Sequence, residues 1–175
     1  SSNRRPVLLL GTTDFHGFID PEWVVNQNIK IEKAGAKLFA AVKKSYVEAA
    51  GLYPVVHVDA GDLFQGTLVS NMFEGQAVID YLNYIQLDAV ALGNHDFDYG
   101  PLGTKSVPSE AADHPLGALL ERMNQSRFPW LAANVSDTKN RFEGKLAMVK
   151  VIEKQGVRVG VIGLAGQDTP ETTDR

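Results

Sequence analysis

The chain has 175 residues, of which 44% are hydrophobic and 22% are charged, and this balance is typical of a globular domain with a core rather than a disordered or fibrous chain. A net charge of −4 without clustered lysine and arginine argues against a nucleic-acid polymer as partner. The absence of cysteine excludes disulfides, thiolate zinc sites and cysteine nucleophiles. No apolar run approaches the roughly 20 residues of a membrane span, so none is expected.

The first half of the chain alternates between strand and helix patterns. The apolar run Val7–Leu10 predicts a strand buried on both faces. A helix from Ile31 to about Ala50, which Gly51 ends, is predicted by apolar residues at three- and four-residue spacing: Ile31, Ala34, Leu38, Val42, Tyr46 and Ala49. The next predicted elements are a strand, a helix and a strand at 53–58, 75–86 and 88–92. This alternation predicts a parallel sheet with right-handed crossovers.

The second half begins with an insert at 99–115 that is rich in proline and glycine, which is typical of a loop. A helix with Leu116, Leu119, Leu120 and Met123 on one face and a fourth strand at Trp130–Ala133 are expected next. The segments Leu146–Ile152 and Val157–Leu164 flank Gln155-Gly156, which predicts an antiparallel hairpin. The predicted fold class is therefore α/β, with a mostly parallel sheet and a C-terminal antiparallel hairpin.

Three polar clusters follow the first three predicted strands directly. They are Asp14-Phe15-His16, Asp59-Ala60-Gly61-Asp62 and the run from Gly93 to Asp98. Because the carboxyl ends of neighbouring parallel strands open onto one crevice, the three clusters are expected to converge in space.

These clusters combine oxygen and imidazole ligands without sulfur, a set that suits Mn, Fe, Zn, Mg or similar ions. Asp14 and His16 can reach one ion if the chain curls, and the two oxygens of Asp62 can bridge two ions about 4 Å apart. Asn94 offers a carbonyl oxygen to the second ion. Each cluster alone is also a common turn sequence, but their order at three consecutive strand ends favours a metal site.

The motifs Asp14-x-His16, Gly61-Asp62 and Gly93-Asn94-His95-Asp96 together resemble those of the calcineurin-like metallophosphoesterases. Phe97-Asp98 narrows the resemblance to the 5′-nucleotidase-type branch. Flanking segments are similar as well, so the resemblance covers about Val7 to Gly166. It implies a four-layer αββα sandwich, of which residues 1–175 are the N-terminal portion of the catalytic domain. Further metal-binding histidines and a C-terminal nucleotide-binding domain are then expected outside this stretch.

The resemblance also implies roles for individual residues and a cofactor of two divalent metal ions, drawn from Mn, Zn, Fe, Mg and Ca. Asp14 and His16 hold one ion, Asp62 bridges the two, and Asn94 binds the other. His95 stabilises charge on the phosphoryl oxygens or protonates the leaving oxygen, and Asp98 orients it. A histidine beside cations needs such a carboxylate to hold its tautomer and favour its charged form.

The implied activity is hydrolysis of phosphate esters, nucleotides above all, in a periplasmic or extracellular location. The alternative is a catalytically incomplete fragment, or a non-catalytic module that binds metal or phosphate and needs the missing C-terminal ligands or a partner. In both cases the chain is expected to expose apolar surface and to self-associate or pair with the missing C-terminal part.

Other polar and aromatic residues receive structural interpretations. His57 inside a strand and His114 in the insert are expected to be structural. Asp59 is expected to support the turn at Asp62 through backbone hydrogen bonds, and Asn134, at the end of the fourth strand, is expected near the site. Packing roles are expected for the two tryptophans, Trp23 and Trp130.

Overall fold

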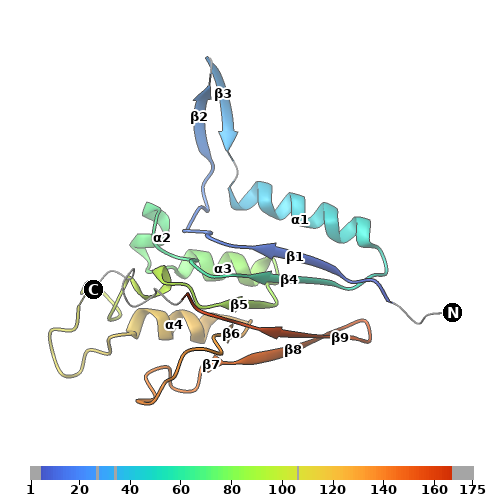
Figure 1. Ribbon diagram of the computed structural model, residues 1–175. Coiled ribbons are helices and arrows are strands. Elements are labelled where there is room, and N and C mark those ends of the chain that lie inside the picture. The colour runs from blue at the N-terminus through green and yellow to red at the C-terminus, as the bar shows by residue number, and fades with distance from the viewer. Residues whose placement is uncertain (1–4, 27, 34, 106, 167–175) are drawn as a thin grey trace.

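A parallel five-stranded sheet forms the centre of the computed structural model, which describes residues 5–26, 28–33, 35–105 and 107–166. The strands, in spatial order, are β1 (Leu8–Thr12), β4 (Val55–Asp59), β5 (Ala89–Ala91), β6 (Trp130–Leu131) and β7 (Leu146–Ala147). Every neighbouring pair is parallel, which confirms the predicted sheet (Figure 1).

Helices pack on one face of this sheet. They are α1 (Ala36–Ala50), α3 (Gln76–Tyr84) and α4 (Gly117–Gln125). The short helix α2 (Leu68–Met72) contacts α3, and a 3₁₀ helix η1 spans His95–Phe97. The larger core lies between helices and sheet, where Phe64, Ile79 and Trp130 are fully buried. Burying each such side chain stabilises the fold by about 1.5–3 kcal/mol. The packing role expected of Trp130 is confirmed.

An antiparallel hairpin of β8 (Val149–Lys154) and β9 (Val157–Ile162) covers part of the other face, as predicted. Successive strand residues point to opposite faces, so Leu131 joins Ile152 in a second core while Trp130 faces the helices. The predicted start of the hairpin was wrong, because the residues of β7 pair with β6 in the central sheet. The chain bends at Met148 as it passes to the hairpin layer.

A second hairpin, absent from the predictions, precedes α1. Strands β2 (Glu22–Asn26) and β3 (Ile29–Lys33) pair antiparallel and project away from the sheet (Figure 1). The predicted helical start at Ile31 was therefore wrong, because β-branched and aromatic residues on both sides of a turn favour a ladder over a helix. Ala34, which the helical pattern included, lies outside the described residues. We call β2 and β3 the arm.

The arm keeps its apolar side chains in solvent. The packing role expected of Trp23 was wrong, since its side chain is 55% exposed; Lys30 Nζ lies 4.5 Å from the ring centroid. A tryptophan on a projecting two-stranded ribbon has no second layer to pack against.

The prediction that the first strand is buried on both faces was wrong. Leu9 is 61% exposed, because β1 is an edge strand and the second core lies over β4, β5 and β6. On α1, Phe39 and Ala40 pack on the core, whereas the predicted stripe of Leu38, Val42 and Tyr46 is exposed. The expected exposed apolar surface is therefore present. No helix in the described part of the chain is long and apolar enough to cross a membrane.

Candidate metal centre

The loops after β1 and β4 are joined by backbone hydrogen bonds that continue the pairing of the strands. The N–H of Asp14 donates to the carbonyl of Gly61 at 3.0 Å, and the N–H of His16 donates to the carbonyl of Asp62 at 3.0 Å. The N–H of Gly17 donates to Leu63 in the same way. The first two polar clusters are thereby brought together, as the sequence predicted.

Ligand atoms from Asp14, His16 and Asp62 all lie within 4.8 Å of one another. Asp14 Oδ1 is 3.6 Å from His16 Nε2. The three residues have φ angles of 54°, 46° and 59°, a left-handed region that costs a non-glycine residue about 1–2 kcal/mol. Such strain concentrates at functional sites. Two carboxylates and an imidazole at this separation fit a divalent cation.

The imidazole of His16 has a defined tautomer. Its Nδ1 lies 2.9 Å from the carbonyl oxygen of Gln65, and a carbonyl can only accept, so Nδ1 carries the hydrogen. The lone pair is then on Nε2, the atom that lies near Asp14. In a metal-binding histidine, a hydrogen bond from the other ring nitrogen fixes the tautomer and the orientation of the ring.

The loop after β5 joins the other two through Asp62. The backbone N–H of His95 donates to Asp62 Oδ1 at 2.8 Å. Gly93 permits this approach, because a Cβ there would lie 2.3 Å from the same oxygen. Asn94 lies between these two residues and immediately precedes η1. Its role as a metal ligand stays a prediction.

His95 and Asp98 pair across one turn. His95 Nδ1 lies 2.6 Å from Asp98 Oδ2, and the Asp98 side chain is only 3% exposed, against 32% for His95. A buried carboxylate accepts a hydrogen bond from the Nδ1–H group and holds the ring in place. The rings of His95 and His16 approach edge to face, with centroids 5.3 Å apart. The predicted pair therefore lies beside the candidate ligands.

Asp96 belongs to the site, although no role was predicted for it. Its buried carboxylate accepts the N–H groups of Leu63 and Gly93, both at 2.9 Å, and that of Asp62 at 3.3 Å. Burial raises its pKa to about 7, while hydrogen bonds from the backbone oppose the shift. Asp96 thus ties the β4 and β5 loops together. The only sequence signal was its place in the Gly-Asn-His-Asp motif.

The residues given structural interpretations fall where expected or close by. Asp59 Oδ1 accepts the N–H of Gly61 at 2.8 Å, which confirms its support of the turn. His57 is buried within β4, and His114 Nδ1 accepts a backbone N–H inside the insert. Asn134 bonds both the N–H and the carbonyl of Ala165 and so anchors the segment after β9. A role for Asn134 near the metal centre stays a prediction.

The chain is similar in sequence to known 5′-nucleotidases. No family model matches the chain. It is 35% identical over 119 residues, or 66% of its length, to a snake venom 5′-nucleotidase of Crotalus adamanteus. It is 31% identical over 138 residues, or 77% of its length, to the 5′-nucleotidase of Mus musculus. These matches cover 18% and 21% of the relatives, so the chain spans about a fifth of their length.

The chain is also similar in fold to solved structures of a 5′-nucleotidase precursor and a calcineurin-like phosphoesterase. The 5′-nucleotidase precursor from Thermus thermophilus matches with a TM-score of 0.77 and 32% identity, over 94% of this chain and 29% of that one. The calcineurin-like phosphoesterase YfkN from Bacillus subtilis matches in fold with a TM-score of 0.66 and 23% identity, over 93% of this chain and 49% of that one. The predicted resemblance to 5′-nucleotidases and the calcineurin-like phosphoesterase fold is confirmed.

Proposed function

We propose that this chain is the N-terminal part of the catalytic domain of a two-metal phosphoesterase that hydrolyses nucleotides, as its 5′-nucleotidase relatives are named for doing. The observation that carries the proposal is the convergence of Asp14, His16 and Asp62 beside the His95–Asp98 pair. The similarity to 5′-nucleotidases supports the same reaction class. The groups that read base and sugar, and the remaining metal ligands, are proposed to lie in a further C-terminal region.

The ligands are assigned as the motif order predicts. Asp14 and His16 would hold one divalent ion, Asp62 would contribute to both, and Asn94 would bind the second. Two divalent cations held here supply positive charge that polarises a phosphoryl group and favours its attack by water. Mn, Zn, Fe, Mg and Ca all suit oxygen and nitrogen ligands, so the donor set selects none of them.

His95 is the side chain that acts on the phosphoryl group or on the leaving oxygen. Asp98 holds the proton on Nδ1 and favours the charged form of the ring, because an adjacent carboxylate stabilises an imidazolium. The charged ring donates a hydrogen bond to the phosphoryl oxygens in the transition state or a proton to the leaving oxygen. No covalent intermediate with the protein is required.

The proposal is tested by metal analysis and by release of phosphate from AMP and of nitrophenol from bis-p-nitrophenyl phosphate. A longer chain that includes the downstream region should hydrolyse at least one ester with Mn or Zn. His95→Asn should lower its turnover by about 10²- to 10⁴-fold at unchanged metal content, whereas the control His114→Asn in the insert should not. A metal-loaded longer chain that hydrolyses no ester contradicts the proposal.

A second candidate is a module that binds metal or phosphate without catalysis. Within the described residues, Asp14, His16 and Asp62 are the one group of three acids or histidines arranged to hold an ion, which favours occupancy by a single metal. A metal content of one ion in both the short and the long chain, without hydrolysis by either, would favour this candidate.

Two further proposals concern the surroundings of the protein. The snake venom relatives support a periplasmic or extracellular location. The exposed side chains of Leu9, Ile162 and Leu164 support self-association of this chain or pairing with the C-terminal region. Sedimentation of this chain alone is expected to show an oligomer, and a monomer at high concentration would count against the idea.

A further inference from the structure

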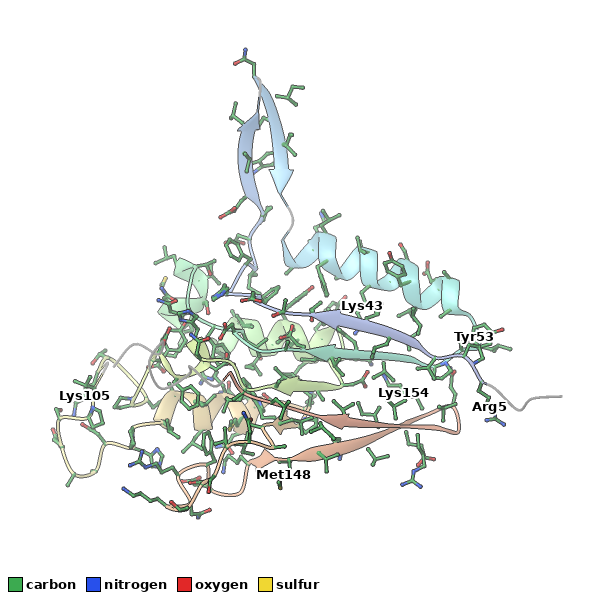
Figure 2. All side chains as sticks on the ribbon, viewed as in Figure 1. Arg5, Lys43, Tyr53, Lys105, Met148 and Lys154 are labelled. Atoms are coloured by element: carbon green, nitrogen blue, oxygen red, sulfur yellow. The ribbon has the colours of Figure 1, made fainter. Side chains whose placement is uncertain are left out.

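A chain of hydrogen bonds runs from α1 to the metal-site loop. Lys43 Nζ on α1 lies 3.0 Å from His57 Nδ1 on β4, and His57 Nε2 lies 3.1 Å from Thr12 Oγ1 on β1. Thr12 Oγ1 lies 2.5 Å from Asp59 Oδ2, and Asp59 Oδ1 accepts the N–H of Gly61 at 2.8 Å. Figure 2 labels Lys43 between α1 and β1.

The direction of the first bond follows from the chemistry of lysine. A protonated lysine has three hydrogens to donate and no lone pair. Its other two partners are the carbonyl oxygens of Ile85 and, at 3.1 Å, Gln86, which can only accept. His57 Nδ1 must therefore accept from Lys43. The ring hydrogen is consequently on Nε2.

The remaining bonds then have one consistent direction. His57 Nε2 donates to the hydroxyl of Thr12, and that hydroxyl donates its own hydrogen to Asp59. The protonation states agree, because burial and the charge of Lys43 lower the pKa of His57 to about 4. Burial lowers the pKa of Lys43 to about 8, so at neutral pH the lysine is charged and the imidazole is neutral.

The chain of hydrogen bonds ends at the backbone turn that positions two candidate ligands. Gly61 directly precedes Asp62, and its carbonyl accepts the N–H of Asp14. A Cβ at Gly61 would lie 2.5 Å from the backbone nitrogen of Gly93, so the turn has no room to shift toward β5. Asp59 thus fixes a crowded turn that both carboxylates depend on.

We propose that Lys43, His57, Thr12 and Asp59 form a positioning chain that holds Asp14 and Asp62 in the geometry for a divalent ion, so that a helix residue sets the affinity of the site. The inference rests on the metal-binding part of the proposed function. A merely structural role predicts a different result, namely lower stability with unchanged metal affinity in the molecules that remain folded.

The test compares two adjacent lysines on α1. Lys43→Met removes the first donor and should weaken Mn²⁺ binding about tenfold, as measured by the electron paramagnetic resonance signal of free Mn²⁺ at a temperature where circular dichroism shows a folded protein. Long-range ¹H–¹⁵N NMR should show that the Nε2–H tautomer of His57 is no longer the single form. The control is Lys44→Met, because Lys44 is exposed and forms an ion pair with the exposed Glu48, at 3.7 Å. The Mn²⁺ affinity of this variant should equal that of the wild type.

A second pair of variants tests Thr12, which lies in the middle of the positioning chain. Thr12→Val keeps the shape and removes the hydroxyl, and it should weaken Mn²⁺ binding at least as much as Lys43→Met. Thr12→Ser restores the hydroxyl and should restore the affinity. Wild-type affinity in Lys43→Met or in Thr12→Val would overturn the positioning chain, as would a wild-type protein that binds no Mn²⁺. A wild-type protein that binds Mn²⁺, in a longer chain that hydrolyses no ester, would contradict the proposed reaction and leave the positioning chain in place.

Discussion

The loops of the metal centre and the arm are both excursions from the sheet, but different interactions hold them. Buried carboxylates bind the backbone of the loops, as Asp59 does at Gly61 and Asp96 does at Leu63. The arm is held by its own ladder from Glu22 to Lys33, and Val25 on it is 70% exposed. An isolated two-stranded ribbon is marginal in stability without further packing.

This difference has an energetic consequence. Loss of a buried acceptor leaves each of its N–H groups without a partner and costs about 1–3 kcal/mol per group. Loss of an exposed side chain usually changes stability by less than about 0.5 kcal/mol. The geometry of the metal site therefore depends on a few polar contacts, whereas the arm tolerates changes in its side chains.

The largest effect is expected from Asp96→Ala, which removes the acceptor for three backbone N–H groups. Stability should fall by about 4 kcal/mol, as measured by urea unfolding, because the Asp96 side chain is buried and each of its N–H donors loses its partner. The matched control is Asp113→Ala in the insert, since that carboxylate also accepts two backbone N–H groups, from Ser109 and Glu110, but at an exposed loop. Equal losses in the two variants would remove the distinction between buried and exposed support.

A smaller effect is expected from pH, through His57. Its pKa is about 4 in the folded protein and about 6.5 when unfolded, so between these values only the unfolded chain binds the proton. Stability should fall as the pH drops from about 6.5 to about 4, by about 3 kcal/mol, and should not fall further through this group at lower pH.

Urea unfolding of the metal-free protein at pH 7 and pH 4.5 measures this contribution. His57→Gln cannot bind the proton, so the stability difference between wild type and variant should shrink by about 2 to 3 kcal/mol over that range. Carboxylates titrate in both proteins and cancel in the comparison. A constant difference would mean that the folded protein binds the proton at His57 as readily as the unfolded chain does.

The convergence of the candidate metal ligands was largely predictable because its signals are local. Each polar cluster follows an apolar run directly, and parallel strands place such positions at one edge. Gly61 and Gly93 mark the two close approaches of the backbone. Sequence alone did not reveal the role of Asp96 or the partnership of Lys43 with His57, because both depend on residues distant in the chain.

The region around α1 was predicted least well, for a different physical reason. Spacing by three and four residues marks an apolar stripe but not the face that meets the sheet, and the stripe of Leu38, Val42 and Tyr46 lies in solvent. Ile31 fits that helical spacing and equally fits the ladder with Val24 that it forms. Local pattern alone did not decide between the two.

The smallest effect is expected on the arm, where a substitution can be compared with the same substitution at a buried position of the core. Val25→Thr exchanges a methyl for a hydroxyl at an exposed strand position and should change stability by less than about 0.5 kcal/mol. Val56→Thr makes the same exchange at a fully buried position of β4 and should cost about 1–3 kcal/mol, because the hydroxyl loses water. Mn²⁺ affinity should be unchanged in Val25→Thr. If urea unfolding gave equal losses of stability for the two variants, the arm would be buried against another surface in solution. The contrast drawn between the arm and the loops of the metal centre would then be wrong.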